Sequence, residues 1–176
     1  MAVNYITDAV RGIIGRQSDW IEASHPVESS EVRRFFQATM DPHPRYWNEK
    51  WAAESRYGKP VAPPAFAVHA FRRPADATDD PLDRMDDPDF DGLSRTLRPG
   101  LPPVPVPLGG ILNGGYEYEF YSYPKMGERI VSRSRFRDIY QREGKSGPMV
   151  FVLVEDEYAT SDGRPLLKAT NTNIMR

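Results

Sequence analysis

Hydrophobic positions have helical spacing before residue 71 and strand spacing after residue 115. In the later part, Tyr116, Tyr118 and Phe120 alternate with more polar neighbours, which is the pattern of a half-buried strand. Further strands are expected near residues 15–23 and over residues 130–140, 149–160 and 164–174. The Asp162-Gly163 pair is typical of a hairpin turn, and short connections of this kind predict antiparallel neighbours.

The first part of the chain predicts short helices. Ser29 or Ser30 can cap the first of them, whose apolar face recurs at residues 32, 35, 36 and 39. The second begins after Asn48, carries Trp47 and Trp51 one turn apart, and ends at Gly58. We expect this aromatic face to pack inward.

A third helix is expected from Pro64 to Phe71, and it has almost no polar face. A helix of this kind must be buried, so an antiparallel sheet of about five strands wrapped around it is the economical arrangement. The fold class is therefore α+β, and 176 residues fit one domain over residues 1–176. Residues 74–108 contain eight of the 17 prolines and eight aspartates, which predicts a long loop, either a solvated acidic insertion or a functional segment.

Composition excludes several classes of function. The net charge of −2 argues against a nucleic-acid binder, and the absence of cysteine excludes disulfides and thiolate chemistry. The three histidines have no acidic or histidine partner spaced along a shared helix face, so no metal site is expected. The longest apolar run, residues 149–154, is far shorter than the ~20 residues of a membrane helix. These features predict a cytoplasmic protein without membrane association.

The stretch from Ala38 to Asn48, followed by Gly58 and the Ala62-Pro63-Pro64 segment, resembles the MaoC-like dehydratases and (R)-specific enoyl-CoA hydratases. In that family an Asp-x-Asn-Pro-x-His-x-Asp segment leads through a short helix to a Gly-x-x-x-Ala-Pro-Pro-like entry into a central helix. Residues 114–120 and the Pro124-x-x-Gly127-Glu128 turn extend the resemblance over nearly the whole chain. The resemblance implies the hot-dog fold, in which an antiparallel sheet wraps around a central helix.

Family members use the aspartate and histidine of this motif to activate a water that adds to an enoyl thioester. Asp41 matches the aspartate, but Tyr46 stands where the histidine belongs and His43 where the asparagine belongs. An unperturbed phenol with a pKa of about 10 is almost wholly protonated at neutral pH, so it cannot easily replace imidazole as the base. This pattern is similar to the non-catalytic half of two-domain or heteromeric dehydratases.

The resemblance therefore implies a substrate-binding subunit of a hetero-oligomeric enoyl-CoA hydratase (3-hydroxyacyl-CoA dehydratase). Such halves pair edge to edge with a catalytic hot-dog partner, which would supply the histidine of this carbon-oxygen lyase. The ligand would be an acyl-CoA thioester, and no cofactor is expected beyond the coenzyme A of the substrate. Three alternatives stay open: a self-sufficient hydratase that uses Asp41 with His43 or Tyr46, a non-enzymatic acyl-CoA-binding module, and a thioesterase. A homodimer in place of the hetero-oligomer also stays open.

Further residues are candidates for substrate binding. In the family a backbone N–H at the start of the central helix holds the thioester oxygen, so the Pro64-Ala65 segment that begins the third helix is a candidate for substrate binding, with Asn48 nearby in the motif. Arg133, Arg135 and Arg137 share one face of a predicted strand, where a row of guanidinium groups either grips coenzyme A phosphates or forms a solvated outer face. We interpret His69 as a core histidine of the third helix.

Overall fold

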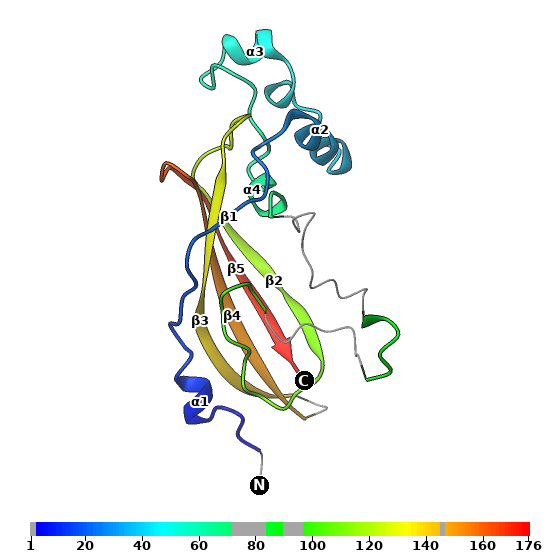
Figure 1. Cartoon of the computed structure of the whole chain (residues 1–176), viewed down its shortest axis with the longest axis vertical. Coiled ribbons are helices and arrows are strands. Elements are labelled where there is room, and N and C mark those ends of the chain that lie inside the picture. The colour runs from blue at the N-terminus through cyan, green and yellow to red at the C-terminus, as the bar shows by residue number, and fades with distance from the viewer. Residues whose placement is uncertain (1–2, 72–83, 90–96, 145–146) are drawn as a thin grey trace.

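The computed structural model describes residues 3–71, 84–89, 97–144 and 147–176. Five antiparallel strands form one sheet in the order β1-β3-β4-β5-β2 (Figure 1). Their bounds are β1 (Ile21–Glu22), β2 (Ile111–Phe120), β3 (Ile130–Gly144), β4 (Gly147–Thr160) and β5 (Pro165–Met175). The helices are α1 (Asp8–Arg11), α2 (Ser29–Ala38), the 3-10 helix η1 (Pro44–Tyr46), α3 (Glu49–Ala53) and α4 (Phe66–His69). The expected α+β class and five-stranded sheet are confirmed.

The sheet has an inner face, which packs against α4 and against residues 97–108, and an opposite outer face. Two apolar clusters lie on the inner face. The first joins α2, α4 and the adjoining ends of the strands, and the second lies beneath Leu101 and Val104 at the other end of the sheet. Figure 1 shows α2 and α3 beyond one end of the sheet, with α4 between them and the strands. The segment from Ala38 to Asn48 therefore lies at the helical end.

The helix α4 is shorter than the sequence predicted. We expected it to run from Pro64 to Phe71, but only Phe66–His69 is helical. Phe66 and Ala67 are buried, whereas the residues that follow them are half-buried, because the sheet covers one side of the helix rather than all of it. The Pro/Asp-rich segment is described only at residues 84–89 and 97–108, and the remainder of that prediction lies outside the described residues.

Three local predictions differ from the structure. Trp47 and Trp51 do not pack inward, because α3 stands at the end of the molecule and leaves their rings 55% and 36% exposed. The residue that caps α2 is Glu28, through its backbone alone, and not Ser29 or Ser30. The first strand is reduced to β1 and a separate bridge between residues 17 and 135.

No helix in the described part of the chain is long and apolar enough to cross a membrane.

Candidate functional site around Asp41 and Tyr46

The end of α2 fixes the position of Asp41. Met40 adopts a left-handed conformation with φ of 54°, and its N–H donates to the carbonyl of Gln37 at 3.2 Å. The N–H of Asp41 then donates to the carbonyl of Phe36 at 3.0 Å. These two bonds are the Schellman pattern that closes a helix, although the left-handed position is usually glycine. The backbone of Asp41 is therefore held by the last turn of α2, and its side chain points into the following loop.

Tyr46 supplies the partner of Asp41. Its ring is only 5% exposed and stacks on Phe36 with 6.0 Å between ring centroids. Its hydroxyl donates a hydrogen bond to Oδ2 of Asp41 at 2.9 Å. Burial, with this hydrogen bond as the second cause, raises the pKa of Tyr46 well above its ordinary value of 10.0. Tyr46 is thus a fixed hydrogen-bond donor to the carboxylate and stays protonated at neutral pH.

Within the described residues, His43 forms no hydrogen bond with Asp41. Its Nδ1 accepts a hydrogen bond from the backbone N–H of Arg45 at 3.2 Å and so caps η1. Its ring lies against Trp51 with a centroid distance of 5.2 Å. Since Nδ1 accepts this hydrogen bond, it is the ring nitrogen with the lone pair, and it would have to take up a proton from a water molecule. His43 can therefore act as a base here only if the cap is broken.

Arg45 and Tyr123 are two residues of this region that the sequence did not single out. Nη1 of Arg45 donates to the Tyr123 hydroxyl at 3.0 Å, and the guanidinium group lies 5.6 Å from the centre of the Tyr46 ring. Tyr123 belongs to the connection between β2 and β3, so this contact ties the motif to the sheet. No sequence spacing could reveal it, because the two residues are 78 positions apart.

The expected substrate-binding residues at the helix start have unequal roles. Oδ1 of Asn48 accepts from the N–H of Trp51 at 3.0 Å, so this side chain caps α3. Pro64 and Ala65 lie directly before α4, as the motif predicted. Within the described residues the N–H of Ala65 donates no hydrogen bond, which leaves it available to a ligand oxygen. Ala65 remains a candidate to hold a thioester oxygen.

The arginine row lies on the outer face of the sheet. Arg133 forms an ion pair with Glu157 at 2.7 Å, and Arg135 forms one with Glu155 at the same distance. Arg137, displaced by a bulge in β3, reaches only the hydroxyl of Thr170 at 3.5 Å. The carboxylates of the neighbouring strand β4 therefore compensate two of the three charges that were candidates for phosphate binding.

His69 lies at the end of α4 and is half-buried, not enclosed in the core as the sequence suggested. Its ring contacts Phe35 and Phe66, with centroid distances of 5.2 and 5.6 Å. Its Nε2 is 4.0 Å from a carboxylate oxygen of Glu31 on α2. His69 therefore joins α4 to α2.

Residues 13–169 match the family described as the FAS1-like dehydratase domain region. The chain belongs to this dehydratase family. The match spans the degenerate Asp41 motif, the start of α4 and most of the sheet, so it confirms the dehydratase resemblance found in the sequence. No curated protein matches the chain.

Solved structures show the same fold as this dehydratase-family chain. The ChsH1-ChsH2 complex from Mycobacterium tuberculosis contains a chain that is 18% identical, with a TM-score of 0.70 over 96% of this chain and 89% of that one. A MaoC-like dehydratase from Rhodospirillum rubrum is 19% identical, with a TM-score of 0.59 over 92% and 91%. The HadBC (3R-hydroxyacyl-ACP dehydratase) complex from Mycobacterium tuberculosis contains a chain that is 19% identical, with a TM-score of 0.59 over 92% of this chain and 96% of that one. The hot-dog fold is confirmed.

Proposed function

We propose that this chain is the substrate-binding, non-catalytic subunit of a hetero-oligomeric enoyl-CoA hydratase (3-hydroxyacyl-CoA dehydratase). The observation that carries the proposal is the hydrogen bond from the buried Tyr46 hydroxyl to Asp41. General base catalysis of hydration needs a group that takes a proton from water near neutral pH. A phenol whose pKa is raised by burial and which already donates to the carboxylate does not meet this requirement. The other candidate, His43, uses its Nδ1 as a helix cap.

The need for a second chain is supported by strand β2. Among the described strands it forms an edge of the sheet and pairs only with β5. Tyr116, Tyr118 and Phe120 stack along its inner face with 5.7 Å between neighbouring centroids, and each is more than 40% exposed. An exposed edge bearing aromatic side chains is a surface on which another strand can pair. In our proposal the catalytic hot-dog subunit pairs there.

Two of the similar structures are complexes of two chains by their names, ChsH1-ChsH2 and HadBC. They support the proposal that this chain assembles with a partner, but they do not identify that partner. In the proposed assembly the partner contributes the intact aspartate and histidine, this chain contributes surface for the acyl group, and Ala65 remains the candidate N–H for the thioester oxygen. The reaction needs no cofactor in this scheme.

Hydration of crotonyl-CoA, with longer enoyl-CoAs as further substrates, tests the proposal. We expect the purified chain alone to be no faster than buffer, and activity to appear when the catalytic hot-dog subunit is added. In the complex, Tyr46→Phe in this chain should change kcat less than about twofold, whereas alanine at the partner's histidine should abolish turnover.

The self-sufficient alternative predicts the opposite pattern. Robust activity of the isolated chain that is lost in His43→Ala or Tyr46→Phe, with both variants still folded by circular dichroism, would show that this site is complete. A chain that binds acyl-CoA but gives no turnover with any catalytic partner would instead be a binding module.

A further inference from the structure

A cleft of about 1120 Å³ opens between α2, α3, the segment before Val61 and the turn between β2 and β3. Its floor is apolar and includes the buried rings of Phe36 and Tyr46. Ligand sites for small organic molecules commonly have volumes of about 300–1,000 Å³, so this cleft can hold a ligand of that size. It lies on the α2 and α3 side of Tyr46.

Three cations from three different parts of the chain line the cleft. Arg33 belongs to α2, Lys59 precedes Val61, and Lys125 lies in the turn after β2, while Glu49 is the one acid of the lining. The charged side chains of the lining thus sum to +2, from three positive and one negative. Across the described ranges none of the three cations forms an ion pair; Arg33 donates only to Oε1 of Gln37, at 3.3 Å.

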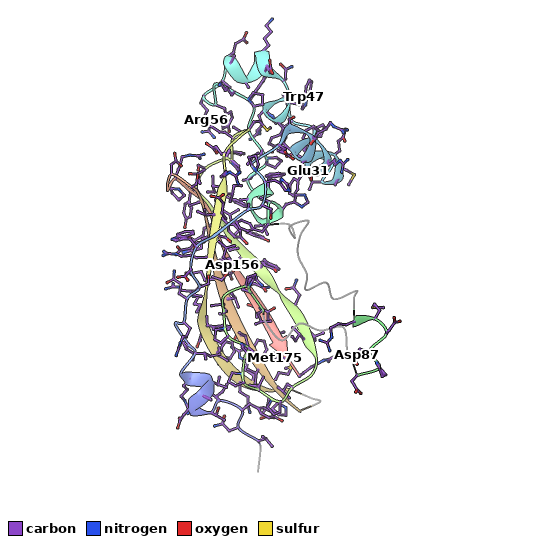
Figure 2. All side chains as sticks on the ribbon, in the orientation of Figure 1. Glu31, Trp47, Arg56, Asp87, Asp156 and Met175 are labelled. Atoms are coloured by element: carbon purple, nitrogen blue, oxygen red, sulfur yellow. The ribbon has the colours of Figure 1, made fainter. Side chains whose placement is uncertain are left out.

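An exposed aromatic ring stands beside these charges. The indole of Trp47 lines the cleft and is 55% exposed, and Figure 2 shows it at the end of the molecule formed by α2 and α3. Its Nε1 donates to the carbonyl of Pro42 at 3.1 Å, which fixes the orientation of the ring. A held indole with a free face is a surface on which a nucleobase can stack.

The two groups of basic residues differ in their surroundings. Arg133 and Arg135 on the outer face lie 2.7 Å from carboxylates, so a phosphate would have to compete with an existing counter-charge. The three cations of the cleft share its lining with Glu49 but form no ion pair within the described ranges.

We propose that this cleft binds the adenosine 3′,5′-bisphosphate end of coenzyme A. The adenine stacks on Trp47, and Arg33, Lys59 and Lys125 pair with the phosphates above the apolar floor. This inference rests on the proposed function in one respect, which is that the ligand is a coenzyme A thioester. It places the phosphate-binding residues at the helical end of the chain and not on the arginine row of β3.

Calorimetric titration of adenosine 3′,5′-bisphosphate into the isolated chain tests the site without any enzymatic turnover. We expect the affinity to fall as the salt concentration increases. Each of Arg33→Gln, Lys59→Gln and Lys125→Gln should lower the affinity roughly tenfold, because each removes one charge-assisted contact to a phosphate. Trp47→Ala should weaken binding of the bisphosphate but not of inorganic phosphate. All four side chains are exposed, so these variants should fold normally, which thermal unfolding checks.

The matched controls are Arg34→Gln, on the next position of α2, and Trp51→Ala, on α3, because neither residue lines the cleft. Both should change the affinity less than about twofold. Absence of bisphosphate binding, or equal losses in the controls, would overturn the site assignment while leaving the hydration experiment with the partner subunit unaffected. Binding of 4′-phosphopantetheine as tightly as the bisphosphate, with no effect of Trp47→Ala, would overturn the nucleotide assignment.

Discussion

At position 46, a phenol stands where the family motif has an imidazole, and the two groups hold their protons differently. An imidazole with a pKa of about 6.5 can accept a proton near neutral pH, whereas a phenol with a pKa of about 10 is a donor there. The sequence predicted this difference from the residue type. The structure adds the direction of the hydrogen bond, from Tyr46 to Asp41, and the burial that strengthens the preference for the protonated form. The carboxylate is therefore oriented by Tyr46 without being coupled to a base.

Tyr46→Phe should lower the free energy of unfolding by about 1 kcal/mol near neutral pH, because the hydrogen bond to Asp41 is lost. This difference should shrink above pH 10. The unfolded wild type begins to ionise Tyr46 near its ordinary pKa of 10.0, while the folded protein, in which the pKa is raised, keeps the proton, so rising pH favours unfolding. Urea denaturation of both proteins at about pH 8 and about pH 10.5 measures the effect; a difference that grows with pH would contradict it.

At the scale of elements, the segment 97–108 is held on the inner face of the sheet by one buried ion pair. Arg98 donates from Nε and Nη2 to the carboxylate of Asp156, with the shortest distance 2.8 Å, and Ser134 donates to the same carboxylate at 2.6 Å. Asp156 is only 2% exposed and lies between the two apolar clusters, within the sheet as Figure 2 shows. Leu101 and Val104 then cover the second cluster. The pair thus aligns a proline-rich segment that has no helix or strand of its own.

Arg98→Met should destabilise the protein by about 3 kcal/mol, because it leaves the buried carboxylate of Asp156 without its cation. The matched control is Arg133→Met, which removes an arginine from a pair whose side chains are 36% and 37% exposed. That control should cost less than about 1 kcal/mol, since water screens the pair. Chemical denaturation of both variants gives the comparison, and equal losses would show that the pair at Arg98 is not the tether of the segment.

At the scale of the whole molecule, the two edges of the sheet are unlike each other. β1 contributes a two-residue edge beside the exposed Trp20, whereas β2 presents ten residues with the stacked rings of Tyr116, Tyr118 and Phe120. Ion pairs cover part of the outer face, while the stacked rings on the inner side of β2 have no apolar cover in the described residues. This asymmetry supports our proposal that the partner subunit pairs with β2.

Tyr118→Glu should weaken association with the catalytic subunit by roughly tenfold or more, because it places a charge in the middle of the aromatic row. The isolated variant should keep its stability, since the Tyr118 side chain is 41% exposed. Trp20→Glu is the matched control, with a ring 46% exposed at the opposite edge, and it should leave the assembly unchanged. Light scattering on mixtures of the two subunits distinguishes the variants. An intact complex with Tyr118→Glu would show that the interface does not lie at β2.

The motif residues illustrate the limit of reading this site from the sequence. Asp41 and Tyr46 were singled out by their order in the motif, and the fold brings them within hydrogen-bonding distance. The spacing also left open a pairing of Asp41 with His43, but the geometry of η1 directs His43 to the backbone of Arg45 instead. Which of two nearby groups contacts a carboxylate depends on loop geometry, and residue spacing alone does not contain that information.

By itself, the sequence determined the strand pattern, the hairpin at Asp162, the apolar character of the helix after Pro64 and the absence of histidine at position 46, because each depends on local periodicity or residue type. The tertiary structure decided the length of α4, the exposure of Trp47, the ion pair between Arg98 and Asp156, and the gathering of Arg33, Lys59 and Lys125 around one cleft. These features join residues that lie far apart in the chain. Only the path of the folded backbone sets such distances, so no local pattern could have predicted them.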